Sequence, residues 1–318
     1  EVFTRIREED PVHWSTMATW DGEPGFWSIT RAEDIHEISR RWDDFSSQDG
    51  GIVITDHGTP LELQTAMFIA MDPPRHDRIK ALFQRGFTPK RIAEHEERIR
   101  EIVKVVLDRL EGRDEVDLVA EITQPVVSRV IGSFVGTPEE DDAAWSDFAL
   151  RAMAFGDEEL QPGGIETVMQ QIHKAFEDGG KLVAERRANP TDDLTSLLVT
   201  AEIDGEGLSD DEIIMGFALL QLAGNDSTKA TFSNGMVALL ENREEWRKLV
   251  DDPSKCETAV EELLRWAPAF AHFRRTANKD VEFRGKHIKK GDKVVMWYPS
   301  SNRDETVFEC PHKFDVDR

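Results

Sequence analysis

The sequence predicts a mainly α protein with a minor β portion (α+β). Apolar residues recur at helical spacing from about Arg75 to Ala267, whereas both ends show the alternation typical of strands. No internal repeat, low-complexity tract or linker interrupts the chain. We therefore predict one domain over residues 1–318, with an N-terminal β-rich part (1–70), a helical body (71–267) and a β segment (268–318).

The N-terminal part begins with strand signals. Residues 14–19 and 26–30 alternate around a turn that contains glycine and proline, which predicts a hairpin. A short helix is expected from Ala32, with Thr30 as its cap. Residues 46–65 are rich in glycine and aspartate and read as a long loop, a kind of segment that often serves function.

Several helix boundaries can be read in the body. Thr88-Pro89 and Thr137-Pro138 each place a capping residue before a proline, which predicts two helix starts. Asn189-Pro190 is expected to end another helix. Ser209 with Glu212 forms a capping box that opens a long apolar helix.

In the C-terminal part the pattern changes to the alternation that is typical of strands. Glycines at 285 and 291 are expected at turns, because glycine adopts backbone conformations that other residues avoid. The predicted strands are residues 272–276, 281–283 and 293–297.

Composition excludes several classes. A formal net charge of −24 disfavours nucleic acid, and a 39% apolar content suffices for a large core. We expect no membrane-spanning stretch and no signal peptide, hence a cytoplasmic protein with Cys256 and Cys310 reduced. The chain opens on Glu1 within a helical pattern and stops at Arg318 after a turn, so we expect a fragment missing both ends.

A polar cluster interrupts the long apolar helix. Glycine and short polar residues are unfavourable there, and such sites usually kink or open a helix. An opened turn with a carboxylate and two hydroxyls would hold a small ligand and relay protons to it. The alternative is a kink with the hydroxyls bonded back to preceding carbonyls. The cluster is Ala223, Gly224, Asn225, Asp226, Ser227 and Thr228.

Two further pairs are candidate sites. Glu262 and Arg265 lie three residues apart late in a helix, where an ordinary surface ion pair is the alternative. His76 and Lys80 lie one turn apart, on one helix face, and would hold a carboxylate unless they are merely solvated.

Two adjacent arginines follow on a strand. Because side chains alternate along a strand, one of Arg274 and Arg275 is expected to point inward and to need an anionic partner.

These segments, in this order, resemble the cytochrome P-450 superfamily of haem-thiolate monooxygenases, in particular the soluble bacterial type. The resemblance implies a cytochrome P-450 fold, truncated at both ends. It assigns the oxygen-binding helix motif to Ala223, Gly224, Asp226, Ser227 and Thr228, the propionate contacts to His76, Lys80 and Arg275, and a structural network to Glu262, Arg265 and Lys313.

The chain departs from the family pattern at three points. Ser227 stands where the family has threonine, and Lys80 replaces an arginine, which keeps the charge but loses the bidentate fork. The loop that carries the axial cysteine is expected beyond Arg318, and neither Cys256 nor Cys310 is assigned as the thiolate. This chain therefore holds no metal ligand and is expected to be inactive by itself.

The resemblance also implies haem b, dioxygen (O2) and electrons from a ferredoxin-type or flavoprotein donor. The substrate is expected to be a lipophilic terpenoid, steroid or fatty acid. The residues expected to line its pocket, each with core packing as the alternative, are Ile52, Val53, Ile54, Met153, Phe155, Leu219, Ala223, Ala269, Phe270 and Ala271.

Two other readings stay open. One is a non-catalytic scaffold of the same fold that binds an apolar ligand, and the other is an unrelated acidic helical protein. Zinc-protease and serine-hydrolase motifs are missing, since Ile99 stands where a zinc helix starting at His95 needs its second histidine.

Overall fold

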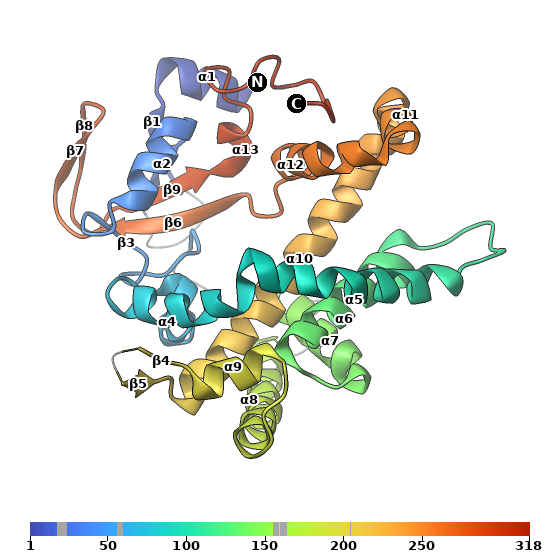
Figure 1. Cartoon of the computed structure of the whole chain (residues 1–318). Coiled ribbons are helices and arrows are strands. Elements are labelled where there is room, and N and C mark those ends of the chain that lie inside the picture. The colour runs from blue at the N-terminus through green and yellow to red at the C-terminus, as the bar shows by residue number, and fades with distance from the viewer. Residues whose placement is uncertain (18–23, 56–59, 155–158, 160–163, 204) are drawn as a thin grey trace. The chain divides into compact units, whose positions relative to one another are not determined.

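The computed structural model describes residues 1–17, 24–55, 60–154, 159, 164–203 and 205–318. These residues form two compact units (Figure 1). The first unit combines Glu1–Thr65 with Ala230–Arg318, and the second comprises Ala66–Lys229. The predicted mainly helical character with small sheets is confirmed, whereas the single domain over residues 1–318 stays a prediction.

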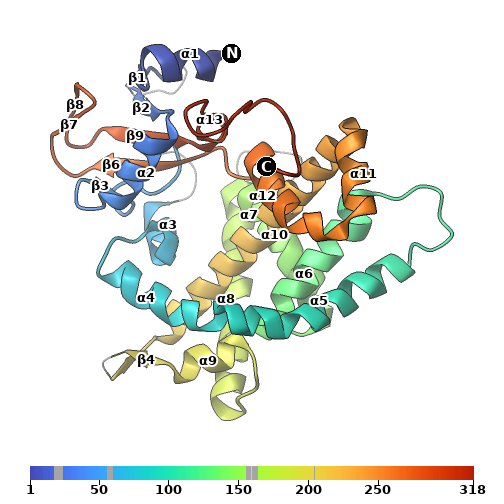
Figure 2. The same cartoon turned by 45° about the horizontal axis from the view of Figure 1, so that its top comes forward.

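The second unit is almost wholly helical, and its principal core lies where α4, α8 and α9 meet the first half of α10. Figures 1 and 2 both show α5 and α6 side by side. The elements are η1 (Phe68–Ala70), α4 (Arg75–Gln84), η2 (Arg85–Phe87), α5 (Pro89–Asp108), the π-helix η3 (Leu118–Thr123), α6 (Gln124–Val135), η4 (Glu139–Asp141), α7 (Asp142–Met153), α8 (Gly164–Ala188), α9 (Leu194–Thr200), β4 (Glu202–Ile203), β5 (Glu206–Gly207) and α10 (Asp210–Glu241), whose last residues belong to the first unit.

The first unit joins both ends of the chain in one sheet. The strand order is β1-β2-β9-β6-β3, with β2 and β9 parallel and all other neighbours antiparallel. Its elements are α1 (Val2–Glu9), β1 (Val12–Ser15), β2 (Phe26–Ile29), α2 (Ala32–Arg40), β3 (Phe45–Ser46), α3 (Leu61–Ala66, whose last residue lies in the second unit), α11 (Arg243–Asp251), η5 (Pro253–Lys255), α12 (Cys256–Trp266), β6 (His272–Ala277), β7 (Val281–Phe283), β8 (Lys286–Ile288), β9 (Lys293–Trp297) and α13 (Tyr298–Ser301).

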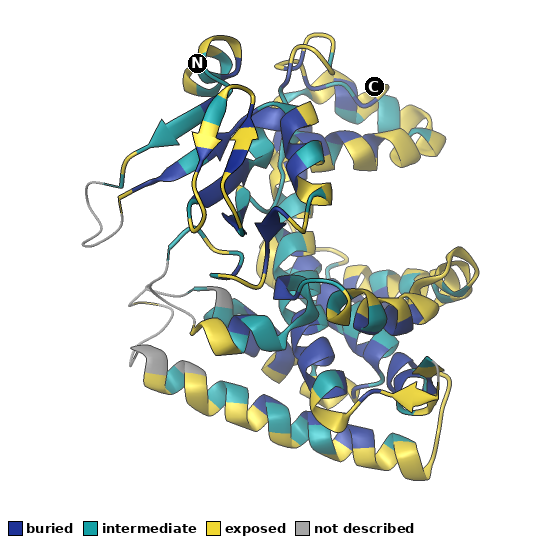
Figure 3. Cartoon of the chain, turned by 90° about the vertical axis from the view of Figure 1, so that its left-hand side faces the viewer, coloured by how far each residue is buried: buried dark blue, intermediate teal, exposed yellow. Residues whose placement is uncertain are grey.

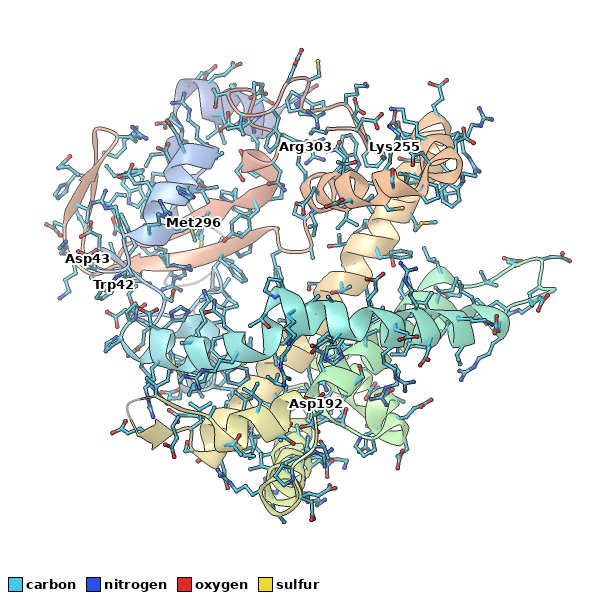
Figure 4. The ribbon with its side chains drawn as sticks, in the orientation of Figure 1. Trp42, Asp43, Asp192, Lys255, Met296 and Arg303 are labelled. Atoms are coloured by element: carbon cyan, nitrogen blue, oxygen red, sulfur yellow. The ribbon has the colours of Figure 1, made fainter. Side chains whose placement is uncertain are left out.

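The core of this unit's sheet is formed by apolar side chains from α2, from the five strands of the sheet and from the β7–β8 hairpin, and the central strand β9 is the most deeply buried. Met296, labelled in Figure 4, is fully buried there. Figure 3 shows the same contrast between dark, buried strands and the long helix α8, which is exposed along much of its length.

The predicted helix signals largely hold. The amide of Arg91 donates to Thr88 Oγ1 at 3.4 Å, with Pro89 as the first helical residue. In the capping box, the Ser209 amide donates to Glu212 Oε2 at 3.0 Å and the Glu212 amide donates to Ser209 Oγ at 3.2 Å. Helix α8 ends at Ala188, before Asn189-Pro190.

Two predicted caps are wrong. Thr30 Oγ1 donates to a backbone carbonyl, and the first amide of α2, on Ala32, instead donates to Asp304 Oδ2 at 2.9 Å. Thr137 Oγ1 has no hydrogen-bond partner among the described residues, because the chain enters α7 through the 3-10 turn η4. At α2 a distant contact with Asp304 therefore replaces the local cap.

The predicted strands at residues 26–30, 272–276, 281–283 and 293–297 are confirmed, whereas the strand predicted at 14–19 is β1, Val12–Ser15. β1 and β2 pair as the expected hairpin, whose residues 18–23 lie outside the described part. Glycines 285 and 291 have φ of 76° and 89°, as turns require. Strand β8 was missed, and the predicted loop 46–65 contains α3, with residues 56–59 outside the description.

One helical run among the described residues, Leu118–Val135, is long and apolar enough by length and composition to cross a membrane. The expectation that no stretch reaches this length overlooked it, because Glu121 and Arg129 interrupt the run.

Candidate functional site

The polar cluster lies within one uninterrupted helix, so the expected opening of α10 is not observed. A Cβ added at Gly224 would lie 2.7 Å from Ile131 Cδ1, so the glycine permits close packing of α6 on α10. Ser227 Oγ donates to the carbonyl of Ala223 one turn earlier, which is the back-bonded alternative. The glycine is therefore explained by packing between helices.

The three proposed catalytic side chains differ in exposure. Asp226 and Ser227 are partly buried and Thr228 is exposed. The residue before them, Asn225, makes a buried polar contact that the sequence did not reveal. Asn225 is fully buried, donates to Gln221 Oε1 at 3.0 Å and accepts from Ser128 Oγ at 2.9 Å. This contact fixes the rotation of α10 against α6.

The first pair of candidate carboxylate-binding residues lies on α4, in the second unit. His76 is partly buried, and its Nδ1 lies 2.8 Å from Asp77 Oδ1, while Lys80 is exposed one turn later. The spacing puts both side chains on one face of the helix, as expected.

The two strand arginines lie in the first unit. Arg274 is the buried one, 3% exposed, and its Nη1 donates to the Val53 carbonyl at 3.4 Å. Arg275 is partly exposed, and its Nη1 donates to the Arg274 carbonyl at 2.8 Å. Burial raises the pKa of the Tyr298 phenol, and the nearby positive charge of Arg275 opposes that rise.

Glu262 and Arg265 form a buried bidentate pair, not a surface pair. Arg265 Nε and Nη2 donate to the two Glu262 oxygens at 2.6 and 2.7 Å, and the Glu262 side chain is fully buried. Arg265 also donates to the carbonyls of Asn302, Pro311 and Lys313. The pair thereby anchors the irregular segment 302–318.

The ammonium of Lys313 lies 2.8 Å from Asp315 Oδ2, so this residue joins the network through its backbone carbonyl. Arg318 is the further cation on Glu262, with Nε donating to Oε2 at 3.2 Å. Sequence reasoning missed Arg318, because only the folded turn shows which basic residue returns to the glutamate.

Arg303, labelled in Figure 4, caps the C-terminal end of α12. Its guanidinium donates to the carbonyls of Arg265 and Trp266 at 3.3 and 2.8 Å and lies over the Trp266 ring. Lys255 precedes α12 at its N-terminus and pairs with Asp317.

The expected pocket residues are spread over both units. In the first, the Ile52 carbonyl accepts the amide of Arg274 at 2.9 Å, and the tilted rings of Phe270 and Phe273 have centroids 5.1 Å apart. Val53 and Ala271 are exposed, whereas Ile54 and Ala269 are partly buried. In the second unit Leu219 is buried and Ala223 partly buried; the side chain of Met153 and all of Phe155 lie outside the described residues.

Each unit offers donors suited to a carboxylate such as a haem propionate: His76 and Lys80 in the second unit, and Arg275 and the Tyr298 hydroxyl in the first. Cys256 and Cys310 are free and exposed, and neither is assigned as an axial ligand. The described part of the chain shows no cluster of three or more side chains that would hold a metal ion.

The polar cluster of α10 and the buried Glu-x-x-Arg pair of α12 agree with the family that the resemblance implies. The cytochrome P-450 family profile matches residues 256–318. A steroid C26-monooxygenase of Mycolicibacterium smegmatis is 34% identical over 99% of this chain and 74% of its own length. A methyl-branched lipid omega-hydroxylase of Mycobacterium tuberculosis is 35% identical over 100% of this chain and 75% of its own length. The chain belongs to the cytochrome P-450 family.

Solved structures show the same relationship. Cytochrome P-450 CYP268A2 of Mycobacterium marinum, in complex with pseudoionone, superposes with a TM-score of 0.87 at 35% identity, covering 99% of this chain and 78% of that one. CYP109E1 of Bacillus megaterium, in complex with testosterone, gives 0.84 at 28% identity, covering 100% and 80%. The predicted fold is confirmed.

Proposed function

We propose that the protein is a haem-dependent monooxygenase that hydroxylates a lipophilic terpenoid, steroid or fatty acid. It would act in the cytoplasm, with O2 and with electrons from a ferredoxin-type or flavoprotein donor. The observation that carries the proposal is the 34–35% identity, over nearly the whole chain, to a steroid monooxygenase and a lipid hydroxylase. Family membership supports the cofactor, haem b.

Bound haem supplies the oxidising chemistry, and the chain's own residues bind and orient its periphery. His76 and Lys80 on α4, and Arg275 on β6, would each donate to a propionate carboxylate. The axial cysteine is proposed to lie in residues beyond Arg318.

Asp226 and Ser227 are proposed to hand protons to the distal side. The Ser227 hydroxyl donates to the Ala223 carbonyl, so its oxygen lone pairs can accept a proton donor while the hydroxyl is held in place. In the complete protein, we expect Ser227→Ala to leave substrate binding unchanged and to divert reducing equivalents to peroxide. An unchanged product yield per NAD(P)H would contradict this role.

The apolar character of Ile52, Ile54, Leu219, Ala269 and Phe270 supports a lipophilic substrate. Binding is tested by titrating a sterol with an intact side chain, and separately a methyl-branched fatty acid, into the haem-loaded protein. A saturable change of the haem spectrum with either compound supports the class, and no change with both contradicts it.

The decisive experiment expresses the complete reading frame, reduces the protein and adds carbon monoxide. A red-shifted Soret band reports thiolate-ligated haem and supports the enzyme. A folded complete protein without this band would be a non-catalytic scaffold instead.

A further inference from the structure

Tyr298 is the single tyrosine of the sequence and follows β9 directly. In the antiparallel pairing of β6 with β9, Phe273 lies opposite Met296 and Arg275 opposite Val294. The Tyr298 amide donates to the Ala271 carbonyl at 3.1 Å, which extends this register by one pair. Because alternate residues share a face, Phe273, Arg275 and Tyr298 project from one side of the sheet.

The ring of Tyr298 is held in place while its hydroxyl is left available. The ring is largely buried and meets Phe273 edge-on, with centroids 5.9 Å apart. Its hydroxyl makes no hydrogen bond to any described residue. Arg275 lies on the same face, two pairs of that face further along the β6–β9 ladder. Its positive charge opposes the rise that burial causes in the pKa of this phenol.

We propose that the Tyr298 hydroxyl and the Arg275 guanidinium together bind one carboxylate group. A guanidinium supplies charge and N–H donors, and a fixed O–H adds one more hydrogen bond to the carboxylate. Such charge-assisted hydrogen bonds are about twice as strong as neutral ones. Since Phe273 already restricts the ring, ordering the hydroxyl costs little side-chain entropy.

The inference rests on the proposed function, in which Arg275 binds a haem propionate and Tyr298 becomes a second anchor for the same group. A fatty-acid substrate presents the same chemistry through its carboxylate. The two sources are distinguished by the probes below.

The single tyrosine allows a site-specific measurement. The chain is labelled with carbon-13 at tyrosine Cζ, and its one resonance is followed on addition of zinc protoporphyrin IX, its dimethyl ester or sodium hexanoate. We expect the resonance to move with the free porphyrin and not with the ester. Movement with hexanoate alone assigns the site to a fatty-acid head group.

Haem retention provides the second readout. The rate of haem transfer to excess apomyoglobin is measured for the wild type, Tyr298→Phe and Arg275→Gln, with Arg40→Gln, at an exposed arginine of α2, as the matched control. Loss of a hydrogen bond to a charged group predicts about 10- to 100-fold faster release for Tyr298→Phe. The control is expected to release haem at the wild-type rate.

The outcomes separate the inference from the proposed function. If haem binds, but Tyr298→Phe releases it at the wild-type rate and porphyrin leaves the wild-type Cζ resonance unmoved, the inference alone is overturned. A complete protein without thiolate-ligated haem overturns the proposed function. If neither porphyrin nor hexanoate moves the resonance, the carboxylate site does not exist.

Discussion

Replacing Gly224 by alanine tests whether this glycine serves helix packing. The added Cβ would lie 2.7 Å from Ile131 Cδ1 and 3.3 Å from Cγ1, well inside the 3.5–4.0 Å of an ordinary carbon contact. Either the Ile131 side chain or α6 must shift. We expect Gly224→Ala to lower the free energy of unfolding.

The magnitude follows from two opposing terms. Overpacking a core costs about 1–3 kcal/mol, and alanine gains about 1 kcal/mol over glycine in a helix. The net loss is about 0–2 kcal/mol. Gly180→Ala in α8 is the matched control, because its Cβ would lie 3.9 Å from Ile214 Cδ1 and only the gain of about 1 kcal/mol applies.

Urea unfolding followed by circular dichroism measures these differences. Ile131→Val removes the clashing Cδ1 atom, so the double variant should recover about 1–2 kcal/mol relative to the sum of the single changes. If Gly224→Ala is as stable as Gly180→Ala, and Ile131→Val shows no coupling to it, the packing explanation is refuted.

Three further predictions use the same assay. Glu262→Gln leaves the buried Arg265 without its charged partner, and we expect a loss of about 3–5 kcal/mol. Burial raises the pKa of Asp142 to about 6, so its contribution to stability is full below pH ~4 and is lost as pH rises to 6; Asp142→Asn should remove up to about 3 kcal/mol of this pH dependence. Asp304→Ala removes the acceptor of the Ala32 amide and should cost about 1–2 kcal/mol.

Each of these has a clear contrary result. A Glu262→Gln protein within 0.5 kcal/mol of the exposed-site variant Glu261→Gln, about the usual range for surface changes, would exclude the network as a support. If the free energy of unfolding varies with pH in the same way from pH 4 to 8 for the wild type and Asp142→Asn, the raised pKa of Asp142 is contradicted. If Thr30→Ala lowers the free energy of unfolding more than Asp304→Ala does, Thr30 is the cap of α2 after all.

The features predicted correctly are those that depend on neighbours in the sequence. The capping box at Ser209 and Glu212 and the proline start at residue 89 each need only one helical turn. Glycines 285 and 291 have positive φ because their tight turns demand it. Short-range backbone chemistry decides these positions, so a single sequence contains enough information.

The errors involve partners far along the chain. Asp304 binds the start of α2 across 272 positions, and no local pattern distinguishes it from Thr30 as the acceptor. The packing of Gly224 on Ile131 joins α10 to α6, so an unfavourable helix residue became favourable through tertiary contact. Arg274 and not Arg275 is buried because residues 52 and 53, more than 200 positions earlier, cover its face of the strand.

The Glu-x-x-Arg pair has a physical task that does not depend on catalysis. Residues 302–318 contain no helix or strand in the described chain, so their carbonyls have few backbone partners. The Arg265 guanidinium supplies donors to three of these carbonyls, and Glu262 neutralises the buried charge while accepting the amide of Asp315 at 2.9 Å. An irregular segment of this length keeps one conformation only when buried side chains replace the missing backbone bonds. Two charged residues one turn apart on α12 therefore hold residues 302–318 in place.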